Sequence, residues 1–164
     1  MSASRQGAPP AGDAEHFVYG PDPDTPGWLT WDVRDQDRFT ALLGPLRVRA
    51  EGDREARLRM IPRPIHRNLA DGLHGGAMMA LIDVALFATC RVFDLFDVGR
   101  ASTVDLSVQF IGPARTDRPL DIVTEILRET GRLVFLRGLA VQDDGDASLC
   151  AAFSGTVRKP PRDR

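Results

Sequence analysis

The sequence predicts an α+β domain in which one long helix packs on an antiparallel sheet. The 164 residues match the length of one domain. A single apolar run over residues 77–93 has the composition of a buried helix. Two β patterns precede this run and four follow it, joined by short, turn-like links that favour antiparallel neighbours. One helix against one such sheet gives two layers.

The composition excludes several classes of protein. Hydrophobic residues make up 43% and charged residues 27%, which is typical of globular domains and not of collagen-like, coiled-coil or disordered chains. The net charge of −2 argues against a nucleic-acid partner. No signal-peptide pattern and no apolar run of about 18 residues occurs, so we expect a cytoplasmic protein without a membrane partner. Cys90 and Cys150 lack zinc-site spacing and are expected to be buried thiols, and no metal site is predicted.

The chain divides into four segments. Residues 1–27 contain five prolines and four glycines and are expected to form a mobile tail. Residues 28–45 carry bulky apolar side chains and a short helix capped by Asp35, and we expect a packed N-terminal arm. Residues 46–158 hold the main domain, and residues 159–164 a frayed tail.

Within the main domain, the period of the apolar residues assigns each element. Residues 46–50 and 55–61 flank a polar, Gly-containing link and predict a β-hairpin. Small and polar residues at 68–76 predict a loop before the 77–93 helix. Strands are then expected at 104–110, 120–129, 132–142 and 147–158. The helix is too apolar to be covered by one curved sheet alone, so part of its surface is expected to contact a second copy.

Asp83 lies in the middle of this apolar helix. An isolated ionised carboxylate in an apolar interior costs several kcal/mol unless it is paired, hydrogen-bonded or protonated. Its helical neighbours Met79, Ala80, Leu86 and Phe87 offer no ion-pair partner. Two interpretations stay open: a structural Asp bonded to a nearby hydroxyl, or a general base or nucleophile.

His74, Gly75 and Gly76 stand directly before the predicted helix. Glycines there let a ligand approach unpaired backbone N–H groups, and the positive end of the helix dipole favours a developing oxyanion. The structural alternatives are a capping role for His74 and close helix–strand packing for the glycines.

The spacing of Gly75 and Asp83 constrains any joint role. Eight residues correspond to about 12 Å along a helix, so the two cannot both contact one reacting carbonyl. If both act on one substrate, they come from different chains. Two antiparallel helices about 8–10 Å apart across a two-fold axis would bring the start of one near the middle of the other. The sequence therefore predicts a homodimer with two interfacial sites.

Taken together, these motifs resemble the hotdog-fold acyl-CoA thioesterases of the phenylacetate-degradation (PaaI-like) type. The resemblance covers residues 46–158 and implies a long central apolar helix wrapped by a five- to six-stranded antiparallel sheet. The residues that carry it are Asn68, Gly72, His74, Gly75, Gly76, Asp83, the strand at 103–110, Gly112 and Pro113.

The resemblance implies hydrolysis of an acyl-CoA thioester to free acid and coenzyme A. The Gly75 N–H would polarise the carbonyl, and Asp83 of the partner subunit would act as nucleophile or as base for water, with both routes open. Asn68 and His74 would position the thioester or the water, and Thr103 would contact the carboxylate or the water. Strict alternation puts Thr103 on the polar face of its strand, so this role requires a bulge or a site that opens on that face.

Substrate binding is expected from Gly76, Met79, Arg115 and Arg132. Arg63, Arg67 and Arg158 are further candidates for the phosphates, because a guanidinium suits a phosphate group. No cofactor is expected, since coenzyme A is part of the substrate. The acyl group stays open among aryl-acetyl, hydroxybenzoyl and medium-chain groups, as does the pairing of dimers into a tetramer.

Three other functions compete with this one. A non-catalytic acyl-CoA-binding hotdog module remains the main alternative. Hotdog hydratases and dehydratases lose support because no Asp stands five residues before any His of this chain. Serine or cysteine hydrolases rank last, since the chain has no G-x-S-x-G motif and no Cys near a base.

Overall fold

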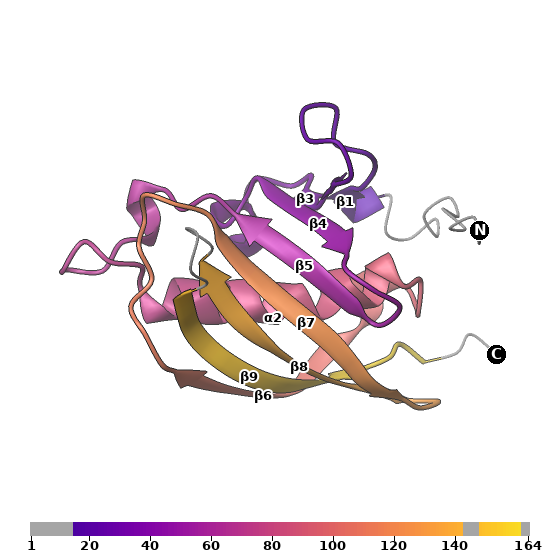
Figure 1. Cartoon of the computed structure of the whole chain (residues 1–164). Coiled ribbons are helices and arrows are strands. Elements are labelled where there is room, and N and C mark those ends of the chain that lie inside the picture. Colours follow the sequence, from indigo (N-terminus) through magenta and orange to yellow (C-terminus); the bar gives the residue numbers. More distant parts are fainter. Residues whose placement is uncertain (1–14, 143–147, 162–164) are drawn as a thin grey trace.

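The computed structural model describes residues 15–142 and 148–161 and shows one long helix against an antiparallel sheet (Figure 1). Helix α2 spans Gly75–Val92. The strands of the main sheet are β2 (Leu29–Thr30), β4 (Leu46–Ala50), β5 (Glu55–Met60), β6 (Ser102–Phe110), β7 (Leu120–Glu129), β8 (Leu133–Gln142) and β9 (Ser148–Arg158). Short β1 (Phe17–Val18) and β3 (Asp32–Val33) form a second sheet, and 3-10 turns lie at η1 (Phe39–Leu42), η2 (Pro64–His66) and η3 (Val98–Arg100).

The order of the main sheet is β2-β4-β5-β7-β8-β9-β6, with every neighbouring pair antiparallel. The predicted hairpin is present as β4 and β5, and the four later strands lie where the alternation placed them. The sheet has seven strands rather than five or six, because Leu29 and Thr30 of the N-terminal arm pair with Val48 and Arg47 of β4. Strand β6 forms one edge and pairs only with β9.

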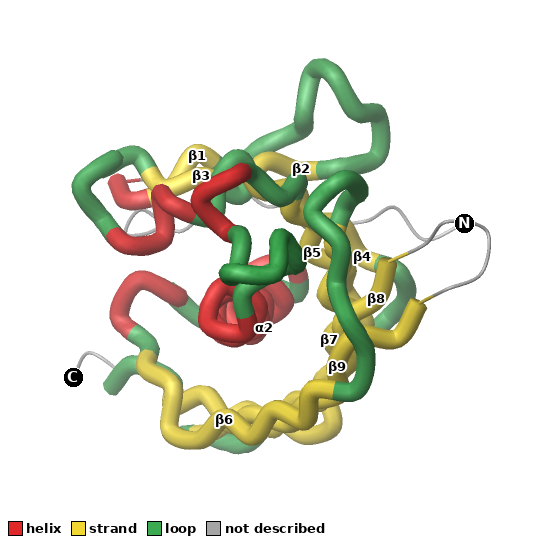
Figure 2. Tube along the Cα trace, turned by 90° about the vertical axis from the view of Figure 1, so that its left-hand side faces the viewer, coloured by secondary structure: helices red, strands yellow, loops and turns green. Residues whose placement is uncertain are grey.

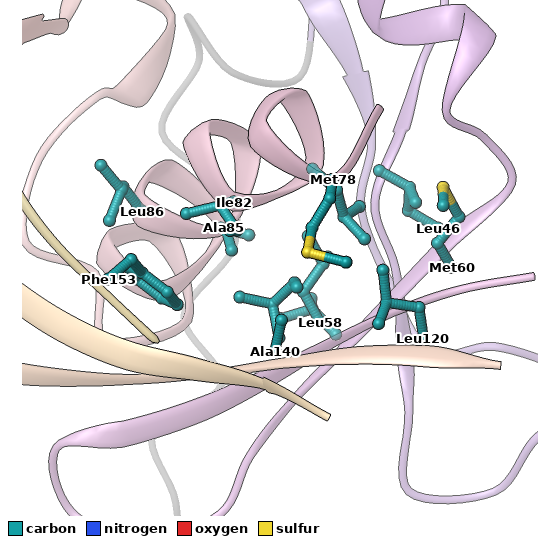
Figure 3. Packing of buried hydrophobic residues seen from close by; sticks show 14 of the residues in the cluster. Leu46, Leu58, Met60, Met78, Ile82, Ala85, Leu86, Leu120, Ala140 and Phe153 are labelled. Carbon is teal, nitrogen blue, oxygen red and sulfur yellow. The ribbon is translucent and has the colours of Figure 1, made fainter. Parts of the chain in front are cut away.

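The sheet curves around α2, as the view along the helix shows (Figure 2). Irregular pairing interrupts β6, β7 and β9, and bulges of this kind bend strands and increase their twist. The curved inner face buries Met78, Ile82 and Leu86 of α2 against strand residues such as Leu58 and Phe153 (Figure 3). Burial of each large apolar side chain contributes about 1.5–3 kcal/mol to folding.

The position of α2 in the core explains its apolar sequence. It begins two residues earlier than the predicted 77–93 helix because His74 caps it, and Phe93 ends it. Its length and composition would also suffice for a membrane span, yet half of the segment is buried inside the domain. Within residues 15–142 and 148–161, no other helix meets those criteria.

The N-terminal segment departs from the expected mobile tail over residues 15–27, whereas residues 1–14 lie outside the described part. Phe17 stacks on Trp31 with ring centroids 4.7 Å apart, and Tyr19 meets the same indole edge-on. Trp31 is only 1% exposed. The prediction of a mobile tail considered only the prolines and glycines of the segment. It did not consider Phe17 and Tyr19, which pack on Trp31 and so order the segment.

The flanks of the main domain are also packed. The short helix of the arm is the 3-10 turn η1, and its N-cap residue is Arg38 rather than Asp35. The expected frayed tail, residues 159–164, is held at its start by the Lys159 N–H, which donates to the Arg132 carbonyl. Residues 162–164 lie outside the described part.

Gly138 of β8 tests how tightly the sheet is packed. A Cβ there would lie 2.1 Å from the Val123 carbonyl oxygen and 2.5 Å from the Phe153 ring. We expect Gly138→Ala to lower the free energy of unfolding by at least about 2 kcal/mol, because the backbone must shift. Gly131→Ala is the matched control, since a Cβ at Gly131 meets no atom within 4 Å. Equal denaturant midpoints for the two variants would contradict this packing.

Candidate active site

One face of α2 is left partly uncovered by the sheet. Met79 is 40% exposed, and Asp83 and Phe87 follow at four-residue spacing, both half-buried. These residues lie on neighbouring turns of one face. Asp83 is therefore not a core residue of the single chain, as the apolar surroundings suggested, but the charged position in an otherwise apolar stripe.

Thr103 of β6 contacts Asp83 directly. Its hydroxyl donates a hydrogen bond of 2.6 Å to Asp83 Oδ1. The register of β6 against β9 shifts between Thr103 and Asp105, so that Thr103 pairs with the inward-facing Val157. This is the bulge that a role for Thr103 required. The structural alternative for Asp83, a bond to a nearby hydroxyl, is also present, and the bond holds the carboxylate in one orientation.

At the start of α2, one backbone N–H group is hydrogen-bonded and its neighbour is not. His74 Nδ1 accepts a 2.9 Å hydrogen bond from the Gly76 N–H and so caps the helix. A Cβ at Gly76 would lie 3.0 Å from this ring nitrogen, which explains the glycine there. The Gly75 N–H has no acceptor among the described residues. Gly75 is thus the free donor, whereas the predicted contact of Gly76 with substrate competes with the cap.

A single chain does not bring Gly75 and Asp83 together. Both belong to the uninterrupted helix α2. Their separation along its axis is therefore the about 12 Å expected from their spacing.

Asn68 organises the loop before the helix. Its Oδ1 accepts from the Ala70 and Gly72 N–H groups at 2.9 and 3.1 Å, and its Nδ2 donates to the Leu73 carbonyl. The amide is committed to its own loop on both sides. In the single chain, Asn68 shapes residues 68–73 through these hydrogen bonds.

His66 is a buried residue that the sequence interpretation missed. Its Nδ1 accepts from the Arg63 N–H, and its Nε2 donates to the Leu42 carbonyl at 2.6 Å. Its own carbonyl accepts from the His74 N–H at 2.8 Å. His66 therefore connects the N-terminal arm to the residue that caps α2. Only tertiary contacts reveal this role, because the neighbouring Pro62 and Pro64 indicate no more than an interruption of the strand.

The two arginines predicted for substrate lie at opposite ends of the sheet. Arg115 is near the helix start, since the neighbouring Ala114 carbonyl accepts from the Leu73 N–H. Its guanidinium hydrogen-bonds Asp117 and lowers the pKa of that carboxyl to about 2. Arg132 lies in the β7–β8 turn at the other end. One chain cannot bring both to the same phosphate.

The remaining arginine candidates have other contacts or lie on strand β9. Arg63 donates to the Leu42 carbonyl, and Arg67 lies 3.9 Å from Asp71. Arg158, the last residue of β9, is exposed and pairs with Ser102 of β6.

Two hollows in the chain lie away from Asp83 and Gly75. One of about 350 Å³ is enclosed by the arm and Arg63, and one of about 450 Å³ lies on the sheet near Val123 and Leu139. Within the described ranges, no cluster of His, Cys, Asp and Glu has the arrangement of a metal site. Burial raises the pKa of the Cys90 thiol to about 12, which disfavours a nucleophilic thiolate. The Asp83 face thus carries the clearest acid–base chemistry of the described residues.

Comparison with known proteins agrees with this geometry. Residues 72–148, which include Gly75, Asp83 and Thr103, match the family model of the thioesterase superfamily. This part of the chain is therefore similar to the thioesterase superfamily. No curated protein sequence matches the chain.

Several solved structures share the fold. Thioesterase superfamily member 2 from Mus musculus has a TM-score of 0.63 and 19% identity over 73% of this chain and 86% of its own. The TT0310 protein from Thermus thermophilus has 0.60 and 25%, over 77% and 99%. The PaaI protein from the phenylacetic acid degradation operon of E. coli has 0.62 and 15%, over 77% and 87%. The predicted hotdog fold is confirmed, and these neighbours agree with a PaaI-like branch.

The buried bridge through His66 can be tested by its effect on stability. We expect His66→Ala to lower the free energy of unfolding by about 1–3 kcal/mol, because the Arg63 N–H loses its acceptor and the Leu42 carbonyl loses a donor. Urea denaturation provides the measurement, with the exposed His16→Ala as control. A loss no larger than that of the control would show that the bridge is not structural.

Proposed function

We propose that this protein hydrolyses acyl-CoA thioesters to the free acid and coenzyme A. The observation that carries the proposal is that one helix presents both groups that the reaction needs. Gly75 has an unused N–H donor, and Asp83 has a carboxylate that a hydroxyl orients. The match of residues 72–148 to the thioesterase superfamily model supports thioester hydrolysis as the reaction class.

The active site is formed by two chains in this proposal. Antiparallel α2 helices that place Gly75 of one chain opposite Asp83 of the other have their two-fold axis at the midpoint, which is Met79. Met79 is the most exposed large apolar residue of α2, and such a residue suits contact with its own copy across an axis. The free edge of β6 offers a further surface for pairing.

The chemistry follows from the two groups. A thioester carbonyl gains negative charge when it is attacked. A fixed N–H donor such as that of Gly75 stabilises this charge and raises the rate of the reaction by about 10²–10³-fold. The Thr103 hydroxyl occupies Asp83 Oδ1 and leaves Oδ2 for the reaction. In one route, Oδ2 attacks the carbonyl, the C–S bond breaks to release the coenzyme A thiolate, and water then opens the mixed anhydride to the free acid and the Asp83 carboxylate. In the other, Oδ2 accepts a proton from the attacking water, and the tetrahedral intermediate then expels the coenzyme A thiolate, which takes up a proton.

Coenzyme A would lie between arginines of both chains. Arg115 stands near Gly75 of its own chain. Leu133, the residue after Arg132, stands roughly 10 Å from Ser102, two strand spacings across β8, β9 and β6. In the dimer, Arg115 of one chain and Arg132 of the other therefore approach the same site. His74 and Asn68 support this site by shaping the loop and the helix start.

A further pairing of dimers is compatible with the outer face of the sheet. Phe135, Leu139 and Leu149 of β8 and β9 are exposed large apolar residues. Exposed apolar residues gathered on one face are typical of contact surfaces. Sedimentation of the purified protein distinguishes dimer from tetramer.

Substitution of Asp83 tests the reaction. We expect Asp83→Asn to lower kcat for hydrolysis of a suitable acyl-CoA by about 10²-fold or more, with folding retained. Thr103→Val should lower kcat less, by about tenfold, and Thr103→Ser should restore it, because only the hydroxyl is used. Release of free thiol provides the measurement.

The matched control is Asp53→Asn in the exposed β4–β5 turn, which should keep normal turnover. Near-normal turnover by Asp83→Asn would reject its catalytic role. Tight acyl-CoA binding without turnover by the unmodified protein would instead favour the binding-module alternative.

A further inference from the structure

Phe110, the last residue of β6, lies against the first residue of α2. Its Cζ and Cε1 atoms would be 3.4 and 3.6 Å from a Cβ built on Gly75. The ring is nevertheless 51% exposed. Phe110 thus lies beside the helix start and is also accessible from outside the chain.

The backbone at Phe110 is held firmly. Phe110 pairs with the small buried residue Ala151 of β9. The N–H groups of Ile111 and Gly112 both donate to the Cys150 carbonyl directly after it. The ring is therefore carried by a strand end with fixed hydrogen bonds, and not by a free loop.

This position matters for any carbonyl that accepts the Gly75 N–H. Such a carbonyl oxygen lies about 2.9 Å from the nitrogen. In our proposal, the substituents of its carbon lie on the side of Gly75 that faces the Phe110 ring. The nearest exposed helix side chain, Met79 one turn on, is also apolar. Phe110 and Met79 therefore offer apolar surface beside the helix start.

We propose that Phe110 determines acyl specificity by limiting bulk at the carbon next to the thioester carbonyl. The preferred acyl group is apolar and unbranched at that carbon, and it packs against the ring face. This inference rests on the proposed thioesterase function. One misplaced methyl group in an apolar site typically changes kcat/KM by about 10–200-fold.

Isomeric substrates isolate the effect of branching from that of size. Butyryl-CoA is compared with isobutyryl-CoA, hexanoyl-CoA with 2-ethylbutanoyl-CoA, and 3-phenylpropanoyl-CoA with 2-phenylpropanoyl-CoA for the aryl case. We expect the unmodified protein to prefer the unbranched member of at least one pair by about tenfold or more in kcat/KM. Phe110→Ala should reduce that preference by about tenfold, and Phe110→Leu should be intermediate.

The control variant is Phe39→Ala, which removes an exposed phenylalanine from η1 and should leave every ratio unchanged. Thermal unfolding of each variant verifies the fold, and Phe110→Leu keeps the test valid if Phe110→Ala does not fold. A preference that is the same in both Phe110 variants as in the unmodified protein would overturn the role of Phe110 alone. Absence of turnover for all six thioesters would overturn the proposed function as well.

Discussion

The rigidity of α2 is the constraint on which the rest of the site depends. Gly75 and Asp83 are fixed on one uninterrupted helix, and no side-chain rotation closes a separation of about 12 Å. A carboxylate and an N–H donor that act on one carbonyl must therefore come from two copies of α2. The same helix buries Ile82 and Leu86 in the core and leaves Met79 and Asp83 uncovered. One element thus serves as core and as candidate subunit contact.

The start of α2 is supported from several directions at once. His66 links the Leu42 carbonyl of the arm to the His74 N–H, and His74 in turn caps the helix through the Gly76 N–H. Asn68 closes the loop between them. A donor that stabilises an oxyanion is most effective when it is held in place before the reaction. The N-terminal arm, which lies outside the family resemblance, thereby contributes to the rigidity of the candidate site.

Local patterns predicted the framework, and contacts between distant residues account for the rest. The period of apolar residues gave α2, the hairpin and four later strands, and the conflict at Thr103 indicated the bulge that the structure contains. Composition failed for Phe17 and Tyr19, which are ordered because they pack on Trp31. The positions of His66 and Phe110 could not be predicted from local spacing. His66 is hydrogen-bonded to Leu42 of the arm, and Phe110 lies beside Gly75 because strand β6 ends there.

The two-chain site can be tested directly by mixing two inactive variants. Asp83→Asn removes the carboxylate, and Gly75→Pro removes one N–H at the first helical position, where proline is tolerated. In a mixed dimer, one of the two sites keeps both groups. Chains unfolded and refolded together in equal amounts form mixed dimers in half of the cases, so about a quarter of normal activity should return. No activity above that of the separately refolded variants would contradict a site shared between chains.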